Sequence, residues 1–322
     1  MIITLTANPS HDRTVALGAP LQPGEVQRAE STTTQAGGKG TNISRGALAA
    51  GVATTAVVPA RADDPYVASL AADGIACHPV PHPGSPRVNV TLSDPDGVTT
   101  KINSPGPTLD PATYDALAQA VLDEAATARW VVLAGSLPPG VPVGWYADLV
   151  LALRATPAAV AVDTSDAPLR RLVERLRADR RCAPDLLKPN GEELASLTGH
   201  DAGAVEADPL LAVEAARRLV DDGVTAVLAT LGAHGAVLVD AHGAWLATPP
   251  PTTVVSTVGA GDSSLCGYLL ADLEGLPADG RLARAVAYGS AAAGLPGTGI
   301  PRPDQARPDR VAVRPVDTAA IA

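Results

Sequence analysis

Residues 257–262 read TVGAGD and run directly into an apolar stretch at 263–273. In that stretch Leu265, Leu269 and Leu273 recur every four residues, which predicts a helix with one buried face. The first amides of a helix have no partners within it, and the helix dipole adds partial positive charge at that end. A loop of small residues that opens such a helix therefore predicts a binding site for an anion such as phosphate.

The residues of this loop suit phosphoryl transfer. Because Gly259 and Gly261 carry no Cβ, the backbone can approach a phosphate, and Asp262 beside them can accept a proton from an attacking hydroxyl. The motif is short, so the alternative is a tight turn with an acidic residue in the first turn of a helix. Other parts of the sequence have to decide between the two.

A second glycine-rich segment, GGKGTN at residues 37–42, also opens an apolar helical stretch, which ends near Gly51. It is not a Walker A loop, because the glycine required four residues earlier is missing. The amides of its first two glycines, the Lys39 ammonium and the Asn42 amide can each bond to the hydroxyls or phosphate of a sugar. The alternative is a glycine turn followed by an exposed lysine.

Short apolar runs alternate with amphipathic stretches from about residue 130 onward. The runs lie at 130–134, 160–162, 186–187 and 224–229, and the amphipathic stretches include 142–155 and 209–221. This alternation predicts an α/β fold in which helices cover both faces of a mainly parallel sheet.

Two early segments are typical of turn-linked strand pairs instead. The first pair joins 14–17 to 26–29, and the second joins 87–92 to 98–103 through a DPDG turn. Because no helical stretch accompanies these strands, we expect them to form a small separate sheet. It would be a lid built from about 12–35 and 86–104, inserted in a single domain spanning 1–322.

Composition narrows the classes of function. The formal net charge is −10 and no run of Lys or Arg occurs, which argues against a nucleic-acid partner. The apolar start is too short for a signal peptide and no stretch reaches the ~20 apolar residues of a membrane span. We therefore expect a cytoplasmic protein without a membrane partner. Cys77, Cys182 and Cys266 are far apart, which predicts reduced thiols rather than a zinc site or disulfides.

The order and separation of the two glycine segments resemble the PfkB (ribokinase-like) family of carbohydrate kinases. Further matching residues are Asn8-Pro9, Asp12-Arg13, Asn103, Pro105-Gly106-Pro107, the GSLPPG segment at 135–140, Lys188-Pro189-Asn190 and Glu193. The resemblance covers residues 1 to about 301. It implies a ribokinase-like αβα sandwich with a small, discontinuous β-sheet lid.

The resemblance also implies roles for individual residues. Asp262 would be the base that deprotonates the acceptor hydroxyl, while the amides of Gly259, Ala260 and Gly261 would stabilise charge on the transferring phosphoryl group. Glu193 would lie near Mg²⁺, with a structural pair at a helix start as the alternative. ATP would be bound by Lys188, Asn190, Thr230, Gly232, Gly235 and Gly261.

On the sugar side, the resemblance implies Asp12, Gly38, Lys39, Asn42, Arg87, Asn103 and Ser136. Arg87 and Lys39 are the cations expected to meet a phosphate that the substrate already carries. Lys101 is left out of the expected site.

A resemblance to one branch of the family indicates which sugar accepts the phosphoryl group. Ser256-Thr257 is similar to the 1-phosphofructokinase and tagatose-6-phosphate kinase branch of the family. This implies that ATP phosphorylates fructose 1-phosphate to fructose 1,6-bisphosphate, with tagatose 6-phosphate as the rival acceptor.

Two other classes of protein are alternatives to the kinase. A sensor of sugar or nucleotide that keeps the fold without turnover is one alternative, because a fold does not imply its function. A Rossmann oxidoreductase is rejected, because the first strand meets Asn8-Pro9 instead of a Gly-x-Gly-x-x-Gly turn. The oligomeric state does not follow from the sequence, and a homodimer is carried as a candidate.

Overall fold

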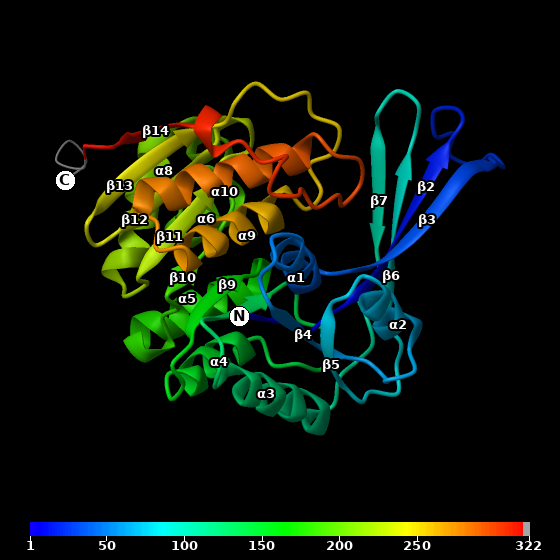
Figure 1. Cartoon of the computed structure of the whole chain (residues 1–322), viewed down its shortest axis with the longest axis horizontal. Helices are drawn as coiled ribbons and strands as arrows, with labels where there is room; N and C mark the ends of the chain where they lie inside the picture. Colours follow the sequence, from blue (N-terminus) through cyan, green and yellow to red (C-terminus); the bar gives the residue numbers. More distant parts are fainter. Residues whose placement is uncertain (318–322) are drawn as a thin grey trace.

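A large sheet forms the centre of the computed structural model, which describes residues 1–317 (Figure 1). Residues 318–322 of the expected domain lie outside the described residues. In this part of the chain the sheet has ten strands, in the order β14-β13-β12-β11-β10-β9-β8-β1-β4-β5. The parallel strands are β1 (Ile2–Thr6), β4 (Thr54–Pro59), β5 (Ala76–Val80), β8 (Trp130–Ala134), β9 (Ala159–Asp163), β10 (Leu186–Leu187) and β11 (Ala226–Thr230).

Antiparallel strands extend one end of this sheet and were not predicted. They are β12 (Ala236–Asp240), β13 (Gly243–Thr248) and β14 (Ala312–Pro315). The Asp240 carboxylate accepts hydrogen bonds from the amides of His242 and Gly243, at 2.7 and 3.1 Å, and so stabilises the turn between the first two. The expectation of a mainly parallel sheet is confirmed.

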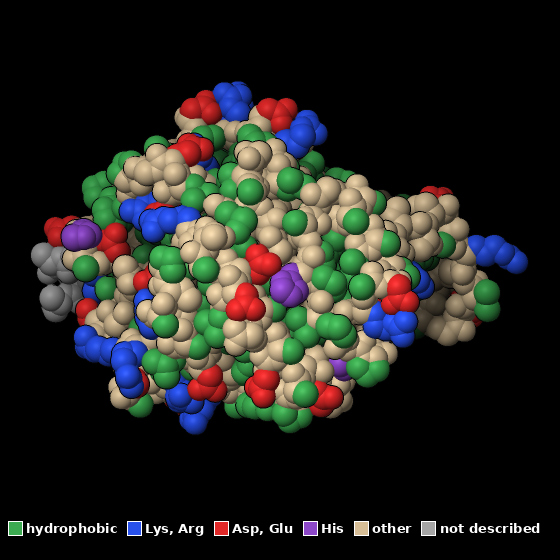
Figure 2. All heavy atoms as spheres, turned by 60° about the horizontal axis from the view of Figure 1, so that its bottom comes forward, with side chains coloured by type: hydrophobic (Ala, Val, Ile, Leu, Met, Phe, Trp, Pro, Cys, Tyr) green, Lys and Arg blue, Asp and Glu red, His purple; other side chains and the backbone are tan. Residues whose placement is uncertain are grey.

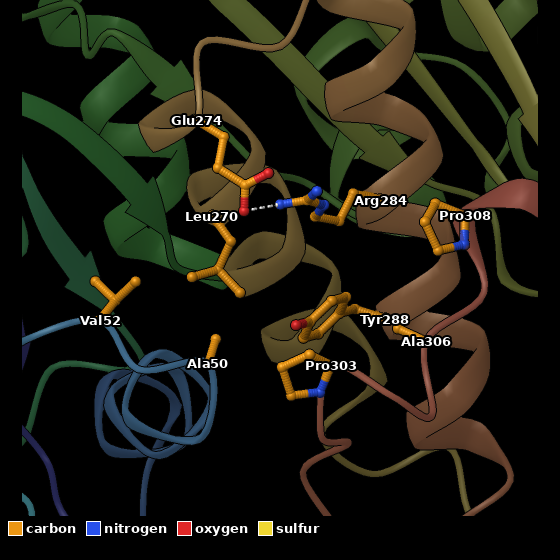
Figure 3. Close-up of a pocket in the computed structure, with 9 residues that line it drawn as sticks. All are labelled: Ala50, Val52, Leu270, Glu274, Arg284, Tyr288, Pro303, Ala306 and Pro308. Atoms are coloured by element: carbon orange, nitrogen blue, oxygen red, sulfur yellow. Dashed lines mark ion pairs between the residues drawn. The ribbon is translucent and has the colours of Figure 1, made fainter.

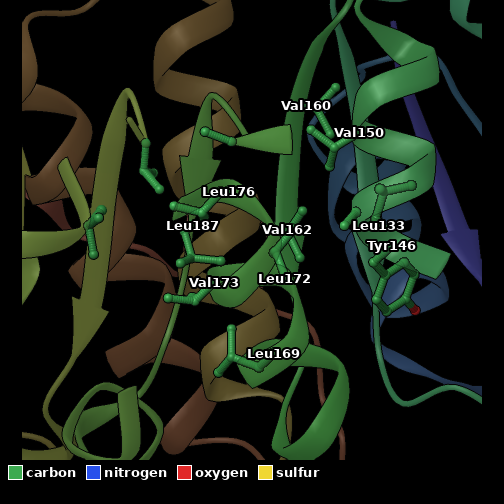
Figure 4. Packing of buried hydrophobic residues seen from close by; sticks show 14 of the residues in the cluster. Leu133, Tyr146, Val150, Val160, Val162, Leu169, Leu172, Val173, Leu176 and Leu187 are labelled. Carbon is green, nitrogen blue, oxygen red and sulfur yellow. The ribbon is translucent and has the colours of Figure 1, made fainter. Parts of the chain in front are cut away.

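Helices cover both faces of the sheet, because successive side chains of a strand point to opposite sides. One face carries α3 (Pro111–Ala125), α4 (Trp145–Leu153), α5 (Asp166–Ala178), α6 (Gly191–Thr198), α7 (Ala202–Ala207) and α8 (Pro209–Asp221), and the other carries α1 (Lys39–Ala49), α9 (Ala260–Leu273) and α10 (Ala278–Ala293). Leu133 faces the first group of helices and its neighbour Val132 faces the second. Figure 4 shows Val162 and Leu187 of the sheet packed near Leu172 and Leu176 of α5.

A small second sheet projects from the main body (Figure 1). Its strand order is β3-β2-β6-β7, with β2 (Ser10–Leu17), β3 (Ala29–Gly37), β6 (Arg87–Ser93) and β7 (Thr99–Asn103). β2 pairs with β6 in parallel, and this pairing joins strands from two separate stretches of the chain in one sheet. The helix α2 (Pro65–Ala72) packs where β3 returns to the main body.

The predicted strand at 26–29 is wrong. Val26 lies in a loop and is 93% exposed, and the strand begins at Ala29 and continues to Gly37. Residues 32–34 are three threonines, whose branched side chains favour extended backbone, whereas Pro20 and Pro23 favour a loop before them.

The surface is mixed in charge. On the face in Figure 2, basic side chains lie among acidic ones without forming a continuous basic patch. Within residues 1–317, no helix combines the length and apolar character that a bilayer crossing requires. This face therefore offers no extended basic surface for a polyanion.

Candidate active site

A cleft of about 920 Å³ lies beside the residues that follow β10 and β11 and the start of α9. Open α/β sheets bind ligands at the carboxyl ends of their strands, because the loops and helix starts gather there. The structure brings these predicted site residues together as lining of the cleft: Lys39, Lys188, Asn190, Thr230, Gly232, Gly235, Gly259, Ala260, Gly261 and Asp262.

The predicted anion hole opens α9. The residue before this helix, Gly259, has a left-handed φ of 79°, which favours glycine, and α9 itself begins at Ala260. Among the described residues no side chain caps this helix start, and the amide of Ala260 makes only a long bond of 3.4 Å to the carbonyl of Thr257, so a ligand can compete for these first amides. The amide of Ser263 donates to the carbonyl of Gly259 at 2.9 Å, which orders the first turn. This arrangement suits a phosphate.

Asp262 lies in the first turn of α9 and is only 6% exposed. Its Oδ2 accepts a hydrogen bond of 2.9 Å from Nδ2 of Asn42, and its Oδ1 is 4.0 Å from Nζ of Lys39. Burial raises the pKa of Asp262 above its ordinary value, although Lys39 opposes this shift. A carboxylate that is oriented in this way and made more basic by burial can act as a general base.

Asp163 is a site residue that sequence analysis missed. It is the last residue of β9 and is fully buried, with Nζ of Lys39 at 2.8 Å from Oδ1 and Nζ of Lys188 at 3.3 Å from Oδ2. Burial alone would raise the pKa of Asp163, but the charges of Lys188 and Lys39 outweigh it and hold the pKa below its ordinary value. Its position could have indicated a site residue, because Asp163 directly follows the predicted apolar run 160–162 and so lies at the carboxyl end of a strand, where ligands bind.

Lys39 lies between two carboxylates, those of Asp163 and Asp262. Burial alone would lower the pKa of Lys39, but these two negative charges raise it above the ordinary value. The ammonium therefore stays charged at physiological pH, and it links the start of α1 to the start of α9.

The predicted sugar-binding residues of the small sheet lie at matching positions. Asp12 pairs across the strands with Asn89, and Asn89 pairs with Asn103. Oδ1 of Asp12 accepts a hydrogen bond of 3.1 Å from Nδ2 of Asn89. Arg87 donates to the carbonyl of Ser104 at 2.9 Å, while its buried Nε has no partner among the described residues. These groups form a polar patch on neighbouring strands.

The glycine segment approaches this patch closely. A Cβ at Gly37 would lie 2.0 Å from Oδ2 of Asp12, so a side chain at that position would clash with the aspartate. Gly38 precedes α1, in which Asn42 holds Asp262. The carboxylate expected to bind sugar hydroxyls therefore lies against the glycine loop before α1, the helix whose Asn42 donates a hydrogen bond to the expected base.

Ser136 has a side-chain partner in the structure, and Lys101 lines the large cleft. Asn8, which was noted only as part of a motif, donates from Nδ2 to Oγ of Ser136 at 3.3 Å and to the carbonyl of Pro105 at 3.0 Å. Lys101, which sequence analysis left out, lines the large cleft together with Lys39. The exclusion of Lys101 from the expected site stays a prediction.

Asn190 and Glu193 form a capping box at the start of α6. The amide of Glu193 donates to Oδ1 of Asn190 at 2.7 Å, and the amide of Asn190 donates to Oε2 of Glu193 at 2.8 Å. This pair is the structural alternative that the sequence analysis gave to a Mg²⁺ role, so Glu193 stabilises the start of α6. Burial raises the pKa of Glu193, opposed by the bond from Asn190.

The acidic residues near the cleft fit Mg²⁺ in one particular mode. Glu192 and Glu206 line the cleft, and Glu193 adjoins them. Within residues 1–317, no three His, Cys, Asp or Glu side chains cluster as a metal site. Mg²⁺ usually keeps several waters and binds through one or two carboxylates plus the phosphates of a substrate. The site suits that mode, in which the nucleotide supplies further oxygens.

A separate cavity of about 190 Å³ lies among α9, α10 and the residues just after α1 (Figure 3). Apolar side chains, including Val52 and Leu270, form much of its wall. Its charged groups, Glu274 and Arg284, are paired at 2.5 Å. Because that arginine is already neutralised, the cavity is poorly suited to holding a phosphate.

Comparison with known proteins assigns the chain and its fold to a family. Residues 6–305 match the sequence model of the pfkB family carbohydrate kinases. The chain belongs to this family. A pfkB-family kinase is a phosphotransferase acting on a sugar, and the α/β architecture with a small second sheet agrees with that membership.

Similar pfkB-family proteins span nearly the whole chain. A 1-phosphofructokinase of Rhodobacter capsulatus is 36% identical over 94% of both chains, and that of Escherichia coli K12 is 32% identical over 83% of both. The structure of phosphofructokinase-2 from Escherichia coli in complex with substrates and products superposes with a TM-score of 0.85 at 28% identity, covering 95% of this chain and 96% of that one.

Proposed function

We propose that this chain transfers the γ-phosphoryl group of ATP to the 6-hydroxyl of fructose 1-phosphate, giving fructose 1,6-bisphosphate and ADP. The observation that carries the proposal is the placement of Asp262 beside the amides of Gly259, Ala260 and Gly261, in one cleft with Lys39 and Lys188. This combination supplies a base, an anion hole and two cations. The names of the similar proteins from Rhodobacter capsulatus and Escherichia coli support the choice of acceptor.

The reaction needs little covalent chemistry from the protein. Asp262 takes the proton of the 6-hydroxyl as that oxygen forms a bond to the γ-phosphorus, and the bond from this phosphorus to the oxygen of the β-phosphate breaks. The amides at the start of α9 and the two lysines stabilise the negative charge on the phosphoryl oxygens. The proton then leaves Asp262 for solvent.

Mg²⁺, held with the triphosphate near Glu193 and its acidic neighbours, would neutralise part of the charge on the β- and γ-phosphates. On the nucleotide side, Thr230, Gly232 and Gly235 offer backbone along the wall of the cleft. We assign ATP to this side because it lies next to the anion hole.

The phosphate that the sugar carries beforehand needs its own cations. Arg87 is suited to this role because its buried Nε lacks a partner within residues 1–317 and Asp12, the expected hydroxyl ligand, is close enough to act on its charge. We propose that Arg87 binds the 1-phosphate, and that Asp12, Asn103 and Ser136 bind hydroxyls. Lys39, which was expected to share the 1-phosphate, lies beside the base and is assigned to the transferring phosphoryl group instead.

A coupled assay of ADP release tests the acceptor. Fructose 1-phosphate, tagatose 6-phosphate, fructose 6-phosphate, free fructose and ribose are supplied in turn, and kcat/KM is compared. We expect fructose 1-phosphate to give the highest value. A preference for tagatose 6-phosphate or fructose 6-phosphate would replace the acceptor alone, whereas the absence of turnover with every sugar would favour the sensor.

The assembly and location are also proposals. A structure of phosphofructokinase-2 from Escherichia coli is described as a tetrameric inhibited form, and it superposes with a TM-score of 0.82 at 28% identity. We propose a homo-oligomer with the homodimer as its unit, which light scattering with and without ATP would test. A cytoplasmic location stays a prediction from the sequence.

A further inference from the structure

Asp163 holds two cations at the wall of the anion hole. Its carboxylate is fully buried, so it does not touch a ligand in the cleft, yet each oxygen faces an ammonium group. Lys39 begins α1, and Lys188 follows β10. Three separate segments of the chain therefore meet at this one carboxylate.

In the absence of substrate, the positive and negative charges around Asp163 are equal in number. Two ammonium groups, Lys39 and Lys188, stand against two carboxylates, Asp163 and Asp262. Lys188 is only 3% exposed, and a charge so deeply buried is retained only when it is paired. Within the described residues, Asp163 is the one acidic partner within 4.0 Å of the Lys188 ammonium.

Lys188 lies directly against the loop that would receive a phosphate. A Cβ at Gly261 would be 3.3 Å from Nζ of Lys188, and this lysine lines the cleft. An ammonium carries three donors, so Lys188 keeps donors for a ligand after meeting Asp163. The same holds for Lys39, which contacts Asp163 at 2.8 Å.

We propose that Asp163 is a positioning residue that fixes the ammonium groups of Lys39 and Lys188 where the transferring phosphoryl group is stabilised. This inference rests on the proposed phosphoryl transfer. Through Lys39 it also sets the charge next to the base, Asp262. The alternative is an ion-pair cluster that stabilises the fold and has no effect on the reaction.

A double-mutant cycle separates these two possibilities. Asp163→Asn removes one negative charge with little change of shape, Lys188→Met removes one positive charge, and the double variant restores the balance of charge. If Asp163 acts through Lys188, the fall in kcat caused by Asp163→Asn shrinks in the Lys188→Met background. Displacing a catalytic group by about 1 Å can cost ~100-fold, so we expect Asp163→Asn alone to lower kcat by about 10- to 100-fold.

Asp185→Asn is the matched control. Asp185 also pairs with a cation, Arg154 at 3.2 Å, and accepts a bond from the amide of Val160 at the other end of β9. Losing it should lower the melting temperature and leave kcat unchanged. A structural role for Asp163 would give that same pattern and overturn the proposal, as would kcat losses that multiply independently in the cycle.

The readouts are kcat and KM for both substrates, measured with the best acceptor of the wild-type protein, together with the melting temperature. If Asp163→Asn alone does not fold, the charge-balanced double variant compared with Lys188→Met still decides, because the proposal predicts a further fall in kcat through Lys39, whereas a structural role predicts equal kcat for these two. A wild-type protein without kinase activity would refute the proposed function, whereas this inference fails only in the comparison among variants.

Discussion

The side-chain amide of Asn42 donates a hydrogen bond of 2.9 Å to the carboxylate of Asp262. The bond joins the start of α1, which follows the glycine segment expected to bind sugar, to the start of α9, which opens the anion hole. In the part of the chain that the structure describes, the other oxygen of Asp262 accepts no hydrogen bond and faces Lys39 at 4.0 Å. Asp262 thus belongs to α9 and is oriented by Asn42 of α1.

The pH dependence of thermal stability should show that ionised Asp262 destabilises the folded protein. Because the pKa of Asp262 is raised in the folded protein, the folded state holds this proton more tightly than the unfolded chain does. The resulting stabilisation is present below the unfolded pKa of about 3.9 and is lost as the pH rises through the folded pKa. Asp262→Asn, which cannot ionise, should therefore unfold at a higher temperature than wild type at pH 7, and the gap should close near pH 4.

Asp110→Asn is a control of opposite sign. A hydrogen bond from Thr113 at the start of α3 lowers the pKa of Asp110, so its contribution is present above the unfolded pKa and is lost in acid. This variant should be less stable than wild type at pH 7. Calorimetry that showed Asp262→Asn also destabilised at pH 7 would contradict the raised pKa of Asp262.

Arg87→Ala should weaken binding of the phosphorylated sugar. A hydrogen bond to a charged group contributes about 1.5–3 kcal/mol, so we expect KM for fructose 1-phosphate to rise by ~10-fold or more. KM for ATP should change little, because only one ligand loses a charge partner. Arg13→Ala, which removes an exposed arginine of β2, is the control. Equal effects of the two variants would remove Arg87 from the phosphate site.

Glu193→Gln should raise the concentration of Mg²⁺ needed for half-maximal activity, because a neutral amide is a poorer partner for a hydrated cation. The side-chain oxygen of Gln can still accept the bond that Glu193 accepts from the amide of Asn190, so α6 keeps its cap. Glu192→Gln serves for comparison. An unchanged Mg²⁺ titration in Glu193→Gln would leave this residue with its helix-capping role alone.

The small sheet should close over the sugar. Gln35 of β3 already donates a hydrogen bond to Thr298, and Thr298 lies close to Gly259 of the anion hole. Closure would exclude water from the reacting groups. Hydrogen exchange should therefore slow in β2, β3, β6 and β7 when fructose 1-phosphate and a non-hydrolysable ATP analogue are added, while β8 of the core stays unchanged. Unaltered exchange in the small sheet would argue against a lid.

The parts of the site that could be predicted are those with a local cause. Gly259 and Asp262 follow from a loop that opens a helix, and the strands β8 and β10 follow from their apolar runs. Asp163 could not be recognised as easily, because its role depends on Lys39 and Lys188, which the fold brings from distant segments. Lys101 likewise reaches the cleft only through the pairing of β7 with β6.

The rate of phosphoryl transfer by Asp262→Asn tests the central claim most directly. The substitution keeps the shape of the side chain and an oxygen that can accept the bond from Asn42, but it removes the base. Loss of a general base usually costs ~100-fold or more. We predict that kcat with fructose 1-phosphate falls by at least that factor while the variant stays folded and binds ATP with nearly unchanged affinity. Turnover close to that of wild type would contradict the account, because the proton of the acceptor hydroxyl would then leave by another route.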